Sequence, residues 1–215
     1  MKKIIVLLLV CVQMTVGHAQ APYKREFALG ASFGANFSNM SFIPRVDTKT
    51  LLGYSGGLVA RWCTEKHLGL QMELNYSQQG WDERFEDPQY VYTRTLNYLE
   101  FPLLTHIYFG EKKVRFFFNL GPKVGYVYSE STEENLNGAQ PNRVNDQHDL
   151  PVEKKFGWGL CGGPGLELRT KAGLFTLEGR YYYALGDIYN SRREDPFAQS
   201  SGQVLSVKLA YLLPF

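Results

Sequence analysis

Several features that would reveal a helical membrane protein or a nucleic-acid-binding protein are missing from this 215-residue chain. Beyond the N-terminus there is no run of about eighteen apolar residues, so the sequence predicts no helical membrane span. Charge of neither sign is in excess, because 23 Lys and Arg against 21 Asp and Glu give a net charge of +2. This near-neutral balance predicts no nucleic-acid partner.

Motifs that carry chemistry are also scarce. The 3 cysteines and 4 histidines show no spacing that resembles a zinc site. The sequence patterns GxSxG and HExxH and a phosphate-cradling glycine loop are absent as well. The sequence therefore predicts no cofactor, no metal and no catalytic residues.

The N-terminus has the composition of a secretory signal peptide. Lys2 and Lys3 precede an apolar stretch over residues 4–16, and small residues occur at 17–19. This order of a positive start, an apolar run and a small-residue cleavage site predicts a signal peptide over residues 1–19, cleaved before Gln20. The mature domain then comprises residues 20–215.

Strict alternation of apolar and polar residues is the strongest pattern in the mature chain. From residue 68 to residue 77, every second side chain is apolar: Leu68, Leu70, Met72, Leu74 and Tyr76. Successive side chains of a strand point to opposite faces, so this stretch predicts a strand with one apolar face. Its length, about ten residues, is what a tilted strand needs to cross a bilayer.

The same alternation recurs along the chain and predicts eight strands. Their approximate ranges are 26–38, 52–63, 68–77, 95–109, 114–129, 156–169, 174–185 and 204–215. Tight polar turns at 64–67, 110–113 and 170–173 alternate with long loops at 39–51, 78–94, 130–155 and 186–203. Short turns at one end and long loops at the other predict an all-β, eight-stranded antiparallel up-and-down barrel in the outer membrane, with both termini periplasmic.

Volume indicates which face of the strands points outward. An eight-stranded barrel has an interior just wide enough to be filled by side chains. The several dozen bulky residues of the apolar face do not fit there, whereas the glycine-rich and polar face does. We expect outer-membrane lipid to cover the apolar face.

The inward set includes ten charged residues that we expect to pair across strands, because isolated buried charges are costly. A polar conduit or proton path is the functional interpretation, and a salt-bridged interior that fixes strand register is the structural one, which we favour. The ten residues are Arg61, Glu73, Glu100, Arg115, Lys123, Glu167, Arg169, Glu178, Arg180 and Lys208.

The C-terminus adds an independent signal. Tyr211, Leu213 and Phe215 share one face of the last strand, and Phe215 is the final residue. A terminal Phe with apolar or aromatic residues at alternate positions resembles the signal that the barrel assembly machinery reads. We therefore expect that machinery to be a partner during biogenesis.

The cysteines indicate neither a lipid anchor nor a disulfide. Acylation of Cys11 as a lipoprotein is disfavoured, because bulky Val10 precedes it and the apolar run before it is short. The strand map places Cys63 near a barrel end and Cys161 near mid-barrel. We therefore predict no disulfide between them and interpret both as space-filling residues.

Six segments resemble the PorT-like outer-membrane β-barrel family. They span residues 30–38, 69–80, 96–104, 120–126, 178–182 and 205–213, with sequences such as GASFGANFS, GLQMELNYSQQG and LNYLEFPLL. The resemblance covers essentially the whole mature chain and implies a small eight-stranded barrel in a Gram-negative envelope. Some members are associated with secretion across the envelope, so the resemblance also implies a secretion-associated role as one possibility.

The long loops offer the remaining candidate sites. Both the second and the third loop carry acidic residues, and these favour a solvated surface over a cation site or a basic partner. They are Asp82, Glu83, Glu86 and Asp87 in the second loop and Glu130, Glu133, Glu134, Asp146, Asp149 and Glu153 in the third. Trp81, Phe85, Tyr90 and Tyr92 are unusual for an exposed loop. Either the two flanking strands extend beyond the membrane as a hairpin, or a partner covers these rings.

We therefore expect a non-enzymatic envelope scaffold or interaction protein that contacts an envelope protein partner through its external loops. A narrow passive pore is the first alternative. The second is a lipid-modifying enzyme, for which His148, Asp146 and Ser129 are the candidate group. A solvated loop explains these three residues with fewer assumptions.

Overall fold

The computed structural model describes residues 25–110, 113–142 and 144–215. The predicted signal peptide at residues 1–19 and Cys11 lie outside this part of the chain. The elements in chain order are β1 (Glu26–Ile43), β2 (Thr48–Lys49), β3 (Leu51–Glu65), β4 (Leu68–Glu83), β5 (Val91–Phe109), β6 (Val114–Asn135), the short helix η1 (Asp146–His148), β7 (Phe156–Thr170), β8 (Gly173–Ala184) and β9 (Gln199–Pro214). Among the described residues, no helix has the length and apolar character needed to span a membrane.

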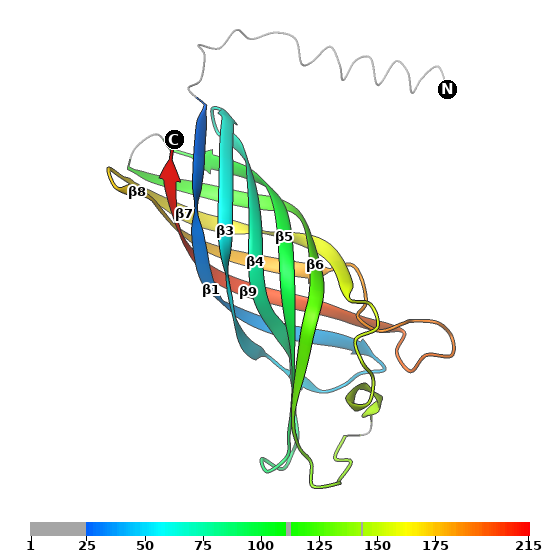
Figure 1. The fold of residues 1–215 in the computed structure, drawn as a ribbon. Helices are drawn as coiled ribbons and strands as arrows, with labels where there is room; N and C mark the ends of the chain where they lie inside the picture. The colour runs from blue at the N-terminus through cyan, green and yellow to red at the C-terminus, as the bar shows by residue number, and fades with distance from the viewer. Residues whose placement is uncertain (1–24, 111–112, 143) are drawn as a thin grey trace, which may run out of the picture.

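The eight long strands close into an antiparallel barrel (Figure 1). Each strand pairs with its neighbour in the chain, β2 aside, and β1 pairs with β9 from Ala28↔Pro214 to Ile43↔Gln199. Closure leaves no free edge along the barrel wall, which satisfies the backbone hydrogen bonds that lipid cannot. The predicted fold is thus confirmed.

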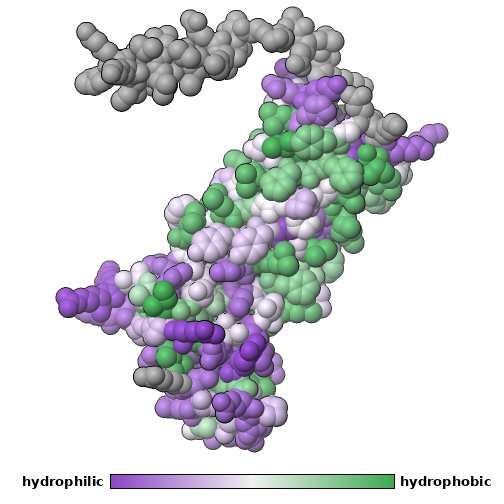
Figure 2. All heavy atoms as spheres, turned by 180° about the vertical axis from the view of Figure 1, so that it is seen from behind, coloured by the Kyte–Doolittle hydropathy of each residue, from purple (hydrophilic) through white to green (hydrophobic). Residues whose placement is uncertain are grey.

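The outer wall carries the apolar side chains that the alternation predicted. Residues such as Phe33, Leu58, Met72 and Leu209 are exposed on the barrel surface, at 36–65% of their accessible area. Figure 2 shows hydrophobic residues covering the wall and hydrophilic residues gathered at the loop end. Such a continuous apolar surface is stable only in contact with lipid.

The inner wall combines small and polar residues. Gly165 lies beneath the inward-facing ring of Phe117, and a Cβ atom there would come within 2.2 Å of the ring. At Gly163, a Cβ would lie 1.8 Å from the carbonyl oxygen of Gly179 on β8. Glycine at these two positions lets a ring and a neighbouring backbone approach the strand closely.

The turn between β7 and β8 is closed by the last strand. Gly173 has φ +145°, a conformation that side chains rarely adopt. The hydroxyl of Tyr211, on β9, donates to the carbonyl oxygen of Ala172 in this turn. The side chain of Tyr211 therefore stabilises the turn in addition to facing outward.

Strand length at the loop end is where the structure differs from the sequence prediction. We predicted strand ends at residues 77 and 95, but β4 continues to Glu83 and β5 begins at Val91. β1, β6 and β9 are likewise longer, reaching Ile43, Asn135 and Gln199. The period of two continues in these extensions, with a register shift in β6 between Val127 and Ser129, but their polar outer residues resemble a loop in the sequence. Of the two explanations for the loop aromatics, the extended hairpin is therefore observed.

Candidate functional site

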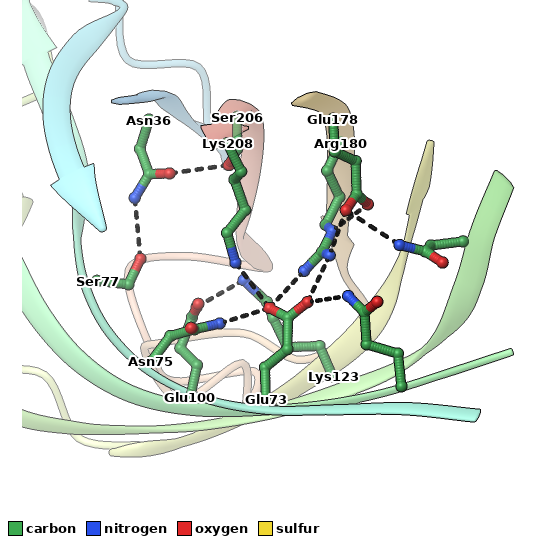
Figure 3. Close-up of polar contacts among 12 residues, drawn as sticks. Asn36, Glu73, Asn75, Ser77, Glu100, Lys123, Glu178, Arg180, Ser206 and Lys208 are labelled. Carbon is green, nitrogen blue, oxygen red and sulfur yellow. Dashed lines mark hydrogen bonds and ion pairs between the residues drawn. The ribbon is translucent and has the colours of Figure 1, made fainter. Parts of the chain in front are cut away.

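The centre of the barrel interior is organised around Glu73 on β4 (Figure 3). Its carboxylate accepts two hydrogen bonds from Arg180 on β8, at 2.9 and 2.7 Å. Lys208 on β9 donates a third at 2.6 Å. Gln71 and Asn75 donate two more, at 2.6 and 2.9 Å. This carboxylate therefore joins opposite sides of the barrel and has few acceptor positions left.

Glu178 is the second carboxylate at the centre and also pairs with Arg180. Its carboxylate accepts from Arg180 Nε at 2.8 Å and from Arg180 Nη2 at 2.9 Å. Asn119 donates to the same carboxylate at 3.0 Å and lies 2.8 Å from the Nδ1 atom of His106. His106 is thus a hydrogen-bonded residue of the interior. Two carboxylates and two cations make the central cluster neutral.

A second ion pair lies closer to the loop end. Lys123 on β6 donates to Glu100 on β5 at 2.5 Å, and Gln79 donates to the same oxygen. The Lys123 ammonium also lies 3.5 Å from the centroid of the Tyr182 ring. On the loop side of this pair lies a small cavity of about 30 Å³ that is lined in part by Tyr98 and Tyr182.

A third cluster lies near the short-turn end. Glu167 on β7 pairs with Arg61 on β3, lies 3.2 Å from Arg169 and lies 4.0 Å from Arg115. Arg169 also pairs with Glu26 at the start of β1. Glu26 was absent from our predicted set, although it shares the inward parity of Ala28 and Gly30. All ten predicted inward charges lie in these three clusters.

The cysteines occupy different parts of the interior. Cys63 is buried with Tyr108 and Phe117, and Cys161 is buried beside Leu104, Tyr182 and Val204. Both thiols are free. Each fills space among apolar side chains.

The loop end is closed by a second hydrophobic core, which we call the loop cap. Three of the long connections and the extended strands contribute buried side chains to it. Its members are Met40, Phe42, Val46, Trp81, Tyr92, Leu96, Val127, Val152, Ile188, Tyr189 and Phe197. Trp81, Tyr92 and Phe197 have no exposed surface. The loops therefore form a packed structure beyond the apolar wall.

A buried carboxylate holds η1 against the hairpin of β4 and β5. Glu83 is only 1% exposed, and it accepts from Asn142 at 2.8 Å and from Gln147 at 2.7 Å. His148 Nε2 lies 3.0 Å from the same carboxylate, and the His148 ring stacks on Tyr92 with centroids 3.8 Å apart. Our expectation of a solvated acidic loop is therefore wrong for Glu83.

Arg94 joins the same elements from the other side. Its guanidinium donates to the carbonyl oxygen of Gln147 at 2.9 Å, to the hydroxyl of Tyr189 at 3.2 Å and to Glu130 at 2.7 Å. It also lies over the Trp81 ring. Burial in this cap raises the pKa of the Tyr189 hydroxyl. These contacts fix loops that sequence analysis left unstructured.

The candidate enzyme residues are not brought together. Ser129 accepts a hydrogen bond from Asn97 at 3.0 Å, whereas His148 is bound to Glu83. Asp146 lies in η1, and in the described part of the chain no hydrogen bond links it with His148 or Ser129. Within residues 25–110, 113–142 and 144–215, no cluster of three or more His, Cys, Asp or Glu residues is arranged to hold a metal ion.

The closed strands, the apolar outer wall and the ion-paired interior define a transmembrane β-barrel of the outer-membrane class. A family model described as "Outer membrane protein beta-barrel domain" matches residues 18–190. The chain belongs to this family, which places it in the outer membrane.

The chain is also similar to several solved structures, all of them distant in sequence. Ail, the attachment invasion locus protein of Yersinia pestis, is 12% identical, with 86% of this chain and 98% of Ail covered and a TM-score of 0.42. Neisserial surface protein A is 11% identical, with coverage of 88% and 99% and a TM-score of 0.42. The outer membrane enzyme PagL is 15% identical, with coverage of 85% and 97% and a TM-score of 0.45. No curated protein sequence matches the chain significantly.

Proposed function

We propose that this protein is a non-enzymatic outer-membrane interaction protein that contacts another envelope component through the loop cap and the strands that extend into it. Both termini lie in the periplasm in this proposal, and the long loops face outside. The PorT-like resemblance makes a secretion-associated complex the best-matched setting for such a partner.

The packed loop cap is the observation that carries this proposal. A barrel that only anchors itself in lipid has no need of a second core beyond the membrane. The cap buries Trp81, Tyr92 and Phe197 and uses Glu83 and Arg94 to hold η1. A preorganised surface binds a partner without the entropic cost of ordering its loops.

The interior supports this role over that of a passive pore. Glu73 on β4 contacts Arg180 on β8, and Glu100 and Lys123 form a second pair nearer the loop end. Each pair occupies the lumen of a narrow barrel. We expect purified protein in planar bilayers to give no steady conductance, and regular ohmic openings would instead favour the pore.

Site-specific crosslinking in the native envelope tests the interaction directly. A photoreactive residue at Asp87, in the turn between β4 and β5, or at Arg193, in the last loop, is expected to capture a defined partner. The same residue at Lys171, in a short turn, serves as the control. Absence of any specific adduct from both loop positions, with the protein correctly folded, would contradict the proposed function.

A further inference from the structure

One strand in the loop region has a free edge. β6 pairs with β7 only as far as Tyr126↔Phe156, yet β6 continues to Asn135. Over this extension β6 pairs on one side with β5, from Asn97↔Ser129 to Val91↔Asn135. Figure 1 shows the hairpin of β5 and β6 continuing past the start of β7. The other side of β6 is therefore an edge.

This edge is open rather than covered by a loop. Every residue from 128 to 135 is exposed. This includes the residues of β6 that lie opposite the cap residues Leu96 and Tyr92 of β5. The last rung is provided by a loop, because the Val127 N–H donates to the carbonyl oxygen of Lys155 at 2.8 Å. Beyond it, the described residues supply no hydrogen-bond partner to the outward backbone groups of β6.

β4 lies on the other side of β5, and its outer edge is protected at the loop end. There β2 adds two rungs to β4, through Thr48↔Glu83 and Lys49↔Asp82. An exposed edge strand of this length is a ready template for strand addition. A small depression, lined by Tyr128, Glu130 and Lys155 among others, lies at the base of the free edge.

Charge selects the occupant of this edge. Glu130 and Glu134 lie opposite Leu96 and Tyr92, so both share the inner face, whereas Glu133 lies opposite Thr93 on the other face. Like charges directly across a strand pair are unfavourable and opposite charges are favourable. A second copy of β6 would bring its own glutamates against these. Glu130 is already paired with Arg94, whereas Glu134 forms no ion pair among the described residues. An added strand with Lys or Arg opposite residue 134 therefore meets an available carboxylate.

We propose that the free edge of β6, residues 128–135, binds an extended basic segment of a partner protein by β-strand addition. Backbone hydrogen bonds along the edge provide affinity, and a basic side chain opposite Glu134 sets the register. This inference rests on the proposed function, since it names the binding surface and the chemistry of the partner.

A synthetic peptide provides the probe. It has ten residues of alternating Thr and Val, with Lys replacing the residue at position three. Its binding to the full-length protein in lipid nanodiscs is measured by fluorescence anisotropy, and amide hydrogen exchange is followed over residues 128–135. We expect saturable binding that weakens with added salt. Exchange at alternate residues of this segment should slow on binding.

Two neighbouring substitutions separate strand addition from general charge attraction. Glu134→Lys is expected to weaken binding about fivefold or more, because it reverses one cross-strand pair. Glu133→Lys makes the same change in net charge on the other face and is expected to have a smaller effect. A peptide with Glu in place of its Lys should recover binding to Glu134→Lys but not to Glu133→Lys.

Several results would overturn the inference. Binding without slower exchange over residues 128–135, or equal loss from both substitutions, would indicate non-specific attraction. No binding by the lysine peptide to the folded protein would also contradict it. Disulfide-linked homodimers of Ser131→Cys in the membrane would identify a second copy as the occupant. If the Asp87 or Arg193 crosslinker captures a partner while these tests fail, the proposed function stands and only this surface is wrong.

Discussion

At the scale of single residues, Glu73 shows how a buried charge is made compatible with a barrel. Its carboxylate lies at 3% residue exposure and is matched by Arg180 and Lys208 on strands across the lumen. A buried carboxylate without partners would be several kcal/mol less stable. The ion pairs of this one carboxylate connect β4, β8 and β9, so they also depend on the register of these strands.

Glu73→Gln is predicted to destabilise the protein by about 3–5 kcal/mol, because it leaves two buried cations without their shared carboxylate. Urea unfolding in lipid vesicles measures this change. The double variant Glu73→Gln/Lys208→Met should lose less than the single variant, since one cation is removed with the carboxylate. Glu194→Gln in the exposed last loop is the control, expected to stay within about 0.5 kcal/mol.

A second residue-scale prediction concerns the outer wall. Met72 is 36% exposed on the apolar surface, and Met72→Arg places a cation in lipid. The expected loss is about 2–4 kcal/mol near the bilayer midplane. Met72→Leu keeps the apolar surface and should change stability little. A stability of Met72→Arg equal to wild type in vesicles would contradict the assignment of this face to lipid.

At the scale of elements, the hairpin of β4 and β5 joins two cores that have different solvents. The part of the hairpin near the short turns contributes apolar residues to the lipid-facing wall. The part near the loops directs Trp81 and Tyr92 into the loop cap. Alternation continues through both parts. Only the environment of each face changes. Within the barrel wall the outer face meets lipid and the inner face meets the ion pairs. At the loop end the outer face meets water and the inner face meets the loop cap.

Trp81→Ala is predicted to open the cap without unfolding the barrel. Removing a fully buried indole costs about 3–5 kcal/mol of local packing. We expect much faster proteolysis of the loop at residues 136–155, with unchanged heat-modifiable migration on gels. Tyr90→Ala, in the same hairpin but outside the cap cluster, should leave proteolysis near wild type. Loss of the folded band in Trp81→Ala would show that cap and barrel are one cooperative unit.

At the scale of the whole molecule, the structure separates a short-turn end, where β1 begins and β9 ends, from a capped loop end (Figure 1). Ion pairs occupy the interior between these ends. Apolar side chains cover the wall between them. The molecule therefore presents an apolar wall to the bilayer and a packed loop cap at one end.

Cysteine labelling tests how this body is oriented. With both native thiols buried, Cys63 and Cys161 should react little with a membrane-impermeant maleimide. Asp87→Cys in the turn at the loop end is expected to label in intact cells. Lys171→Cys in a short turn should label only after the envelope is permeabilised. The reverse pattern would place the termini outside.

Much of the barrel was predictable because its outer and inner faces follow a period of two over long stretches. The strand number, the facing of Met72 and the inward position of Glu73 all follow from that period. Glu26 was missed because it begins the first strand. The loop-end extensions were missed because polar outer residues next to water, such as Thr93 and Glu133, look the same in a strand and in a loop.

The partners of the side chains were not predictable. The sequence alone indicates that Glu73, Arg180 and Lys208 point inward, but strand stagger around the barrel determines which of them meet. Likewise, the aromatic residues of the second loop signal burial without naming Phe197 or Tyr189 as neighbours. Such contacts join positions more than one hundred residues apart.

By itself, the sequence determined the barrel, its strand number and the side of each strand that meets lipid, because these depend on local alternation and on the bulk of the side chains. Only the tertiary structure decided which charges pair, that the loops form a second core, and that β6 extends past β7 with a free edge. Those features depend on strand stagger and on contacts between distant loops, which no local pattern encodes.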